Sequence, residues 1–181
     1  MKKIVLTALV CVMAMVANAQ NFYVGGSLGF WDYNNDDVDA STYTLAPEIG
    51  YKLNSDWAIG AQLAYTHVKA GDAKSDAYGI APYARYTFLH AGMVDLFVDG
   101  AVEYVKADSD DVDGSIFSIG FHPGLAINLS DNFSLVSRIG FLGYNDVDDE
   151  VSSFASSMGY SHGYGLNFNA ANISFGFYYN F

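Results

Sequence analysis

The sequence predicts an all-β protein, an eight-stranded antiparallel up-and-down transmembrane β-barrel. The first observation is the stretch Ala171–Phe181, in which apolar and aromatic residues alternate with small and polar ones. A period of two residues is typical of a strand whose faces meet different surroundings. Secondly, the alternation recurs in segments of about ten residues, the length that a tilted strand needs to cross a bilayer. Thirdly, long and short connections alternate along the chain, as in a barrel with loops at one end and turns at the other.

Residues 1–19 are predicted to be a secretory signal peptide. A basic start is followed by the apolar run Ile4–Val16 and by Ala17-Asn18-Ala19, a small-residue cleavage site. The run is too short to span a bilayer comfortably. The single cysteine, Cys11, lies inside it, so the mature chain is expected to have neither a thiol nor a disulfide. The remainder, 20–181, is expected to form one domain.

The first half of the mature chain contains four alternating segments. Strands are predicted at Phe22–Trp31, at Thr42–Leu53, from Trp57 to about Val68, and at Tyr78–Phe88. Two polar stretches, 32–40 and 69–77, are predicted to be long loops. The connection Asn54-Ser55-Asp56 between the second and third strands has residues that favour a tight turn.

The second half repeats this arrangement. Strands are predicted at Val94–Val105, Ser115–Leu129 and Phe133–Tyr144, and a last strand ends at Phe181. Compact turns are expected at 89–93 and 130–132, and long loops at 106–114 and from 145 to about 160. In the seventh strand, strict alternation places Phe141 outward and Leu142 inward. The sequence leaves open whether Ser161–Ala170 belongs to the last strand or to the preceding loop.

The distribution of charge favours a membrane barrel over a soluble one. A soluble lipocalin-like barrel has the same strand number, but it would turn its aromatic rows inward and its charges outward. Here one face of nearly every predicted strand lacks charge, as expected for contact with lipid. Without Lys2 and Lys3, only 6 of the 8 basic residues remain against 20 acidic ones, so nucleic acid is not an expected partner.

The opposite, inward face carries a predicted charge network inside the barrel. Four of its members, Glu48, Arg85, Asp99 and Arg138, lie at similar depths in their strands, and folding the hairpin between the fourth and fifth strands places Arg85 opposite Asp99. This network could be an ion-conducting or catalytic centre, or a packed polar core. Because eight strands leave room for little beyond side chains and buried charges need partners, the packed core is favoured. The full predicted set is Glu48, Lys52, Arg85, Asp99, Glu103, His122 and Arg138.

Several short motifs carry a resemblance to a known family. They are Ala46-Pro47-Glu48-Ile49-Gly50-Tyr51, Ala81-Pro82-Tyr83-Ala84-Arg85-Tyr86, His122-Pro123-Gly124-Leu125 and the terminal Phe177-Tyr178-Tyr179-Asn180-Phe181. In their order, the mature chain resembles the small eight-stranded outer-membrane barrels of the OmpA/OmpX type. The Ala19-Gln20 junction resembles signal cleavage sites of the Bacteroidetes.

This resemblance implies a location and partners. The protein is expected in the bacterial outer membrane after signal-peptide cleavage, as a monomer surrounded by outer-membrane lipid and lipopolysaccharide. Phe177, Tyr179 and Phe181 resemble the assembly signal that the barrel-insertion machinery reads.

Acidic repeats in the predicted loops are candidate metal ligands. Asp36-Asp37-Val38-Asp39 recurs as Asp110-Asp111-Val112-Asp113, and Asp146-Val147-Asp148-Asp149 is a near copy. Carboxylates suit Ca²⁺ or Mg²⁺, although the spacing does not fit an EF-hand loop. The repeats could equally keep the outer surface solvated. The candidates for weak Ca²⁺ or Mg²⁺ binding are Asp36, Asp37, Asp39, Asp110, Asp111, Asp113, Asp146, Asp148 and Asp149; no other cofactor is expected.

The expected function is non-enzymatic, namely a structural or surface-binding (adhesion) role through acidic extracellular loops toward an unknown ligand. One alternative is a lipid-modifying enzyme at the outer rim, for which a serine activated by a histidine would be needed. His67 with Ser75 is the only rim candidate that the sequence offers. The other alternative is a narrow pore for small solutes.

Overall fold

The computed structural model describes residues 21–35, 38–70, 73–109, 112–157, 160–168 and 173–181. Most of these residues lie in strands: β1 (Phe22–Asn35), β2 (Val38–Lys52), β3 (Trp57–Ala70), β4 (Ala73–Ala91), β5 (Val94–Ser109), β6 (Val112–Asn128), β7 (Phe133–Ile139), β8 (Phe141–Val147), β9 (Gly163–Asn167) and β10 (Ile173–Asn180). Two short helical segments, η1 (Asp149–Val151) and α2 (Ser152–Ser157), follow β8. Neither described helix is long and apolar enough to cross a membrane.

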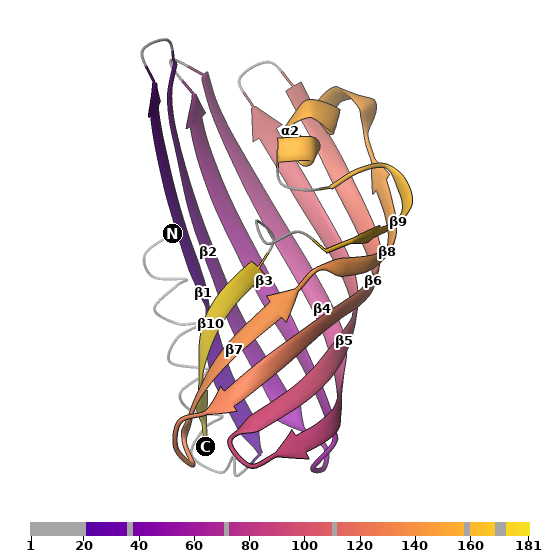
Figure 1. Cartoon of the computed structure of the whole chain (residues 1–181). Coiled ribbons are helices and arrows are strands. Elements are labelled where there is room, and N and C mark those ends of the chain that lie inside the picture. The colour runs from indigo at the N-terminus through magenta and orange to yellow at the C-terminus, as the bar shows by residue number, and fades with distance from the viewer. Residues whose placement is uncertain (1–20, 36–37, 71–72, 110–111, 158–159, 169–172) are drawn as a thin grey trace, which may run out of the picture.

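The strands form a closed antiparallel barrel (Figure 1). Each of β1 to β5 pairs with the next strand, and β6 also pairs with β7. The barrel closes because β7 pairs with β10 and β10 pairs with β1. Further along, β8 continues β7 beside β6, and β9 pairs with β8. Therefore β7 with β8 forms the seventh crossing, and β9 with β10 forms the eighth. The predicted eight-stranded barrel is confirmed, and the undecided segment contributes β9 to the last strand.

A bulge at Gly140 separates β7 from β8. Arg138 pairs with Gly124 of β6, whereas Leu142 pairs with Phe121, so β7 and β8 together contain one residue more than β6 over this span. Gly140 has φ of +77°, a conformation that favours glycine. The extra residue reverses the alternation, so the predicted facing of Phe141 and Leu142 was wrong: Phe141 packs against His122 at 5.1 Å between ring centroids, while Leu142 is 50% exposed.

The hairpin ladders continue well beyond the predicted strands. Pairing runs up to Asn35↔Val38 between β1 and β2, to Ala70↔Ala73 between β3 and β4, and to Ser109↔Val112 between β5 and β6. The described residues of the first three stretches predicted as loops, 32–40, 69–77 and 106–114, are therefore mostly paired strand, whereas the fourth, from 145 to about 160, contains the end of β8 and both helical segments. Polar side chains end the lipid-facing alternation, but they do not prevent backbone pairing, because each N–H and C=O still needs a partner.

Tight turns close the opposite end of the barrel, here called the turn end; the end with the long hairpins is the loop end. The Asn54 Oδ1 accepts hydrogen bonds from the backbone N–H groups of Asp56 (2.9 Å) and Trp57 (2.8 Å). At 130–132, the Ser130 Oγ accepts one from the N–H of Phe133 at 3.1 Å. These side chains satisfy turn backbone that has no strand partner.

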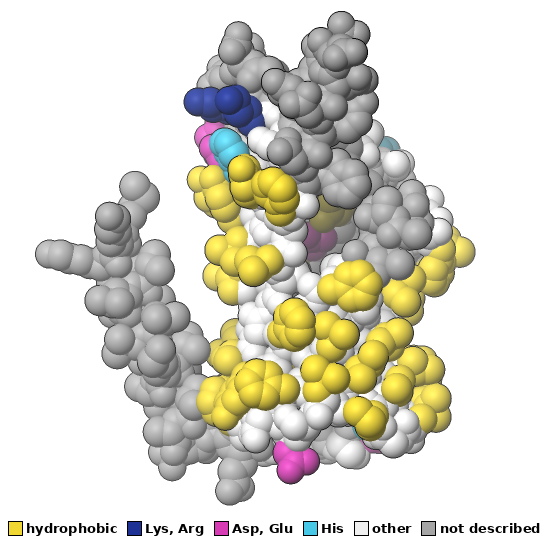
Figure 2. All heavy atoms as spheres, turned by 60° about the vertical axis from the view of Figure 1, so that its left-hand side comes forward, with side chains coloured by type: hydrophobic (Ala, Val, Ile, Leu, Met, Phe, Trp, Pro, Cys, Tyr) yellow, Lys and Arg dark blue, Asp and Glu magenta, His cyan; other side chains and the backbone are white. Residues whose placement is uncertain are grey.

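Exposed apolar side chains lie on all ten strands, and on the face shown in Figure 2 they form a band between the two ends of the barrel. Leu28, for example, is 80% exposed and Phe177 is 64% exposed. Aromatic pairs lie near both ends of this band, with centroid distances of 4.7–5.2 Å: Trp57–Tyr86, Phe133–Tyr179 and Tyr179–Phe181 near the turns, and Phe30–Tyr43 and Tyr65–Tyr78 toward the loops. An apolar belt with aromatic rows at two levels is the surface of a barrel embedded in lipid.

Candidate functional site: a charged cluster inside the barrel

Four charged side chains meet inside the barrel, each from a different strand. Glu48 comes from β2, Arg85 from β4, Asp99 from β5 and Arg138 from β7. All four occupy the inward positions of their strands. Asp99, Glu48 and Arg85 are buried, at 1%, 5% and 7% exposed, and the Arg138 side chain is 17% exposed.

The first contact is the cross-strand pair Arg85–Asp99. The two residues face each other in the β4–β5 register, as the folded hairpin predicts. The Arg85 Nε donates to Asp99 Oδ1 at 2.7 Å, and its Nη2 donates to Oδ2 at 2.8 Å. Two parallel hydrogen bonds of this kind fix the guanidinium and carboxylate planes relative to each other. The guanidinium also lies 3.8 Å from the centre of the Phe97 ring.

Arg138 joins both carboxylates of the cluster. Its Nε donates to Asp99 Oδ2 at 2.8 Å, while Nη2 and Nη1 donate to Glu48 Oε1 at 2.8 Å and Oε2 at 3.1 Å. The cluster therefore extends across the interior from β5 to β2. It contains two positive and two negative groups, so each buried charge has an opposite partner, without which burial would be costly.

Three tyrosines complete the cluster, and the sequence reasoning did not assign them to it. The Tyr178 OH donates to Glu48 Oε1 at 2.6 Å, and the Tyr83 OH donates to the same oxygen. Tyr23 and Tyr83 share a hydrogen bond of 2.5 Å between their hydroxyls. The sequence signal that could have found them is their inward position, which in β1 and β10 places a tyrosine among mostly small inward residues. A Cβ on Gly50 would lie 2.1 Å from the Tyr23 ring, so glycine here makes room for the tyrosine.

The other three residues of the predicted network lie outside the cluster. Glu103 is at the loop-end side, where it accepts a hydrogen bond from the Tyr160 OH at 2.8 Å. The His122 Nδ1 is 3.2 Å from the carbonyl oxygen of Gly140 and can donate to it. Lys52 lies at the turn end, where it lines a cavity. The structure thus brings four of the seven predicted residues together and leaves three apart.

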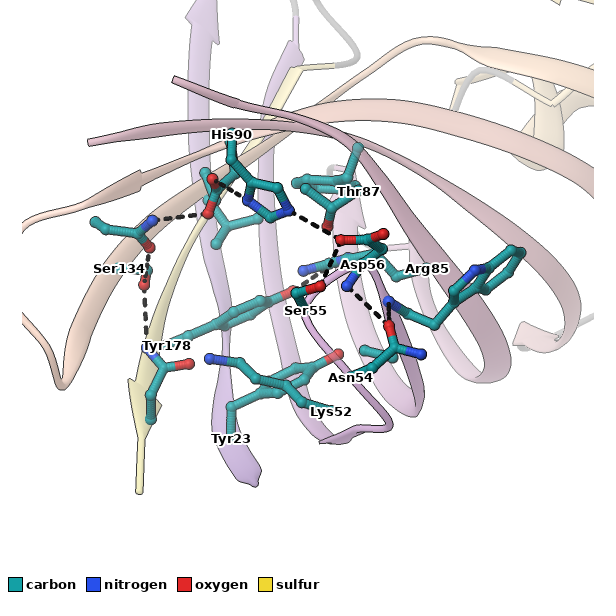
Figure 3. A pocket seen from close by; sticks show the side chains of 18 residues that line it. Tyr23, Lys52, Asn54, Ser55, Asp56, Arg85, Thr87, His90, Ser134 and Tyr178 are labelled. Carbon is teal, nitrogen blue, oxygen red and sulfur yellow. Dashed lines mark hydrogen bonds and ion pairs between the residues drawn. The ribbon is translucent and has the colours of Figure 1, made fainter. Parts of the chain in front are cut away.

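The turn-end cavity has a volume of about 350 Å³ and reaches inward to Arg85, Tyr23 and Tyr178 of the cluster (Figure 3). At its rim the His90 Nδ1 lies 2.8 Å from Asp95 Oδ1, and its Nε2 lies 3.4 Å from Asp56 Oδ1. The hydrogen bond to Asp95 raises the pKa of His90 above its ordinary value. His90 lies beyond the aromatic row of Trp57 and Tyr86, outside the lipid-facing band.

At the loop end, η1 and α2 pack onto the inner wall of the barrel. Val151 and Ala155 are buried against a cluster that includes Val105, Ile116 and Val147. A Cβ on Gly114 would lie 2.6 Å from a methyl group of Val151, so the segment sits close to β6. The Asp148 carboxylate anchors its start, accepting hydrogen bonds from the Ser115 N–H (2.8 Å) and Oγ (2.9 Å).

The predicted metal ligands are only partly described. Asp36, Asp37, Asp110 and Asp111, and the Asp39 side chain, lie outside the described residues. Asp113 faces Asp108 across β5 and β6, and the hydrogen bond between their carboxyl groups raises the pKa of Asp108. Asp146 lies 3.4 Å from His162, Asp148 binds Ser115, and Asp149 begins η1. In the part of the chain that the structure describes, no three His, Cys, Asp or Glu side chains are grouped to hold a metal ion.

The rim candidates for catalysis are not aligned with each other. The His67 Nδ1 lies 2.8 Å from Asp76 Oδ1, and the Tyr65 OH donates to the same oxygen at 2.7 Å. These bonds lower the pKa of Asp76. Ser75 shares the strand face of buried Ala77, whereas Asp76 and His67 occupy the opposite face. The sheet therefore separates the serine from the histidine.

The fold is shared with a solved structure, and a second, weaker match is reported beside it. In a search of solved structures, the crystal structure of Neisserial surface protein A (NspA) has a TM-score of 0.53 and 17% sequence identity, covering 88% of this chain and 97% of that one. The β domain of the Bordetella autotransporter Brka has a TM-score of 0.49 and 11% identity, covering 90% of this chain and 68% of that one. No curated protein sequence matches significantly.

The sequence itself gives the assignment. Residues 4–181 match the family described as outer membrane protein beta-barrel domain, which is nearly the whole chain. Membership in this family implies location in the bacterial outer membrane, where the turn end of such barrels faces the periplasm and the loop end faces outward. The chain belongs to the outer membrane protein beta-barrel domain family.

Proposed function

We propose that this protein is a non-enzymatic outer-membrane barrel with a closed lumen, and that its role is structural or surface-binding. The observation that supports the proposal most strongly is the cluster of Glu48, Arg85, Asp99 and Arg138. Its hydrogen bonds connect β2, β4, β5 and β7 across the interior. A conducting lumen would need charged groups that face water, whereas these are committed to one another and to tyrosine hydroxyls.

A second closure supports the same function. At the loop end Val151 and Ala155 pack against the inner wall of the barrel, while the cavity of about 350 Å³ lies at the turn end. Water entering this cavity from the periplasm would meet Arg85 and the stacked rings of Tyr23 and Tyr178, whose centroids are 5.0 Å apart. The narrow-pore alternative is therefore less well supported than a closed barrel.

The same geometry argues against catalysis. Asp99 accepts hydrogen bonds from two arginines and Glu48 from Arg138 and two tyrosines, which leaves neither carboxylate as a free base directed toward a substrate. At the rim, Ser75 and His67 lie on opposite faces of the sheet. Because a closed lumen does not conduct and neither candidate catalytic site is supported, we infer that the protein acts through its outer hairpins, which would contact molecules outside the cell.

Solute uptake by proteoliposomes tests the closed lumen. Liposomes carrying the folded mature chain are expected to swell in arabinose no faster than protein-free liposomes. Swelling that rises with the amount of folded barrel would contradict the proposal and favour the pore.

Binding by whole cells tests the surface role. Cells that display the chain are compared with cells that each display a variant shortened in one loop-end connection, such as 145–160, all checked for equal amounts of folded barrel. Stronger attachment of the first to host cells or matrix proteins supports surface binding. Equal attachment for every shortened connection would leave the structural role alone.

A further inference from the structure

The turn-end cavity lies on the periplasmic side of the barrel and extends inward to the charged cluster (Figure 3). Its volume of about 350 Å³ lies within the range of small-molecule pockets, about 300–1,000 Å³, and such pockets occur in the mouths of β-barrels. Part of the wall is apolar and includes Ala58, Phe97, Ala126 and Val136. Apolar walls with a few charged or polar groups between them are typical of sites for small organic molecules.

Lys52 is the charged side chain at the mouth of this cavity. It lies four residues after Glu48 in β2, so the two side chains point to the same, inward side of the strand. Lys52 is exposed and lines the cavity, where Figure 3 shows it beside Tyr23. Among the residues that the structure describes, none accepts a hydrogen bond from its ammonium group.

The acidic groups of the cavity are occupied by other donors. Asp95 attracts the Lys52 ammonium through space. However, the Asp95 Oδ1 lies 2.8 Å from His90 Nδ1, and its Oδ2 accepts a hydrogen bond from Asn128 Nδ2 at 2.7 Å. The Asp56 Oδ1 lies 3.4 Å from the other nitrogen of the same histidine. The N–H groups of Lys52 therefore remain available to a molecule that enters the cavity.

A second positive group lies at the inner end of the cavity. Arg85 is 7% exposed; its Nε and Nη2 donate to Asp99, and Nη2 also lies 3.2 Å from the Tyr178 hydroxyl. Its Nη1 donates to no group in the described part of the chain. The Arg85 guanidinium repels the Lys52 ammonium through space. An anion in the cavity that both side chains line would replace this repulsion by two attractions.

We propose that the turn-end cavity binds a small carboxylate with an apolar body. The carboxylate would accept hydrogen bonds from the Lys52 ammonium and from the Nη1 of Arg85, and bonds of this charge-assisted kind are the strong ones. The apolar body would lie against Phe97 and Ala126. The molecule would enter from the periplasm and stop at the charged cluster, so this site is independent of the surface role of the outer hairpins.

The charges at the rim favour a monoanion over a dianion such as phosphate. Asp56 and Asp95 both line the cavity, so a second negative charge on the ligand would be repelled by two carboxylates. A single carboxylate needs only the two positive groups, Lys52 and Arg85. The structure thus favours a singly charged organic acid.

An NMR titration of the folded mature chain in zwitterionic detergent tests the site. The probes are phenylacetate, a small carboxylate with an apolar ring, and phenylacetamide, which has nearly the same shape but no charge. Phenylacetate should shift the amide signals of Ala58, Ala126 and Asn128 saturably. Phenylacetamide should bind about tenfold more weakly or worse, because it cannot make a hydrogen bond between opposite charges.

Three variants identify the group that binds the carboxylate. Lys52→Gln removes the ammonium and should weaken phenylacetate binding about tenfold or more. Lys52→Arg keeps a positive charge at the same position and should retain binding. Lys106→Gln removes the same charge from β5 at the loop end, and it should bind phenylacetate like the wild type.

Four results would overturn the proposal. Phenylacetate could give no saturable shift, or phenylacetamide could bind as tightly, which would mean that the apolar wall alone is recognised. Lys52→Gln could bind phenylacetate like the wild type. Finally, equal shifts at lipid-facing amides such as Leu63 would show that the probe only enters the micelle. If Lys52→Gln does not fold, the comparison of the two probes on the wild type still decides the question.

Discussion

At the scale of single residues, Arg138 and Arg85 hold the interior together. Arg138 binds both Glu48 and Asp99, whereas Arg85 binds Asp99 through two hydrogen bonds. The inward facing of these residues follows from alternation, and the Arg85–Asp99 pair follows from the hairpin register. That Arg138 joins the two carboxylates could not be predicted, because it depends on how non-adjacent strands are placed around the barrel. The tyrosine hydroxyls were missed for the same reason.

Removing one partner of the Arg85–Asp99 pair should destabilise the barrel more than replacing both. Arg85→Ala leaves a buried carboxylate with fewer partners, which costs about 3–5 kcal/mol, whereas a volume-matched apolar pair costs less. We therefore expect Arg85→Ala to unfold at lower urea concentration than Arg85→Met/Asp99→Leu in liposomes. Arg85→Ala with the stability of the wild type would mean that the cluster is solvated.

At the scale of elements, backbone pairing extends further than side-chain alternation indicates. The polar hairpin ends belong to strands, because hydrogen bonding between strands does not require an apolar face. The bulge at Gly140 was also beyond prediction, since a glycine within a strand indicates a bulge only when its φ or its register is known. At the turn end the predicted boundaries were close: β5 begins at Val94 and β7 at Phe133 as predicted, whereas β4 ends at Ala91 rather than at Phe88.

The turn at His90 should make stability depend on pH. The pKa of His90 is raised by Asp95 in the folded barrel, while the unfolded side chain titrates near 6.5. The stabilisation is therefore fully present below the unfolded pKa and is lost as the pH rises through the folded pKa. We expect the wild type to be more stable than His90→Gln at pH 5.5 and equal to it at pH 9, as measured by urea unfolding. A difference that is constant over this range would contradict the ion pair.

The acidic hairpins are proposed to bind Ca²⁺ or Mg²⁺ weakly. Asp108 and Asp113 face each other at the loop end, and four hairpin ends on a narrow barrel concentrate negative charge. A dissociation constant of about 10⁻⁴–10⁻³ M is expected, as for weak extracellular sites. NMR signals of the hairpin amides should shift during a Ca²⁺ titration in detergent. If NaCl at equal ionic strength reproduces the shifts, the aspartates only keep this surface solvated.

At the scale of the whole molecule, one repeated pattern accounts for the fold and the compartment. Alternation in eight crossings predicts a barrel, and the apolar outward face predicts lipid around it; family membership agrees with both. The position of η1 and α2 inside the loop end was not predictable, because Val151 and Ala155 lie in a short segment without strand periodicity.

Assembly of the whole barrel should depend on its last residue. Phe181 closes the aromatic row that contains Tyr179, and its N–H donates to the carbonyl oxygen of Phe22 at 3.0 Å, next to the β1–β10 seam. Deleting Phe181 should lower the amount of heat-modifiable, folded protein in the outer membrane, whereas Phe181→Tyr, as the matched control, should keep it. Unchanged amounts after the deletion would show that this aromatic terminus is not an assembly signal.

Planar-bilayer recording tests whether the charged cluster and the loop-end segment close the lumen. The folded barrel is inserted into a planar bilayer in about 1 M KCl, where screening between exposed charges is nearly complete. Protease protection verifies the insertion independently. If the lumen is closed, no stepwise conductance above that of the protein-free bilayer is expected. Steady, voltage-independent conductance steps that scale with the amount of inserted barrel would contradict it.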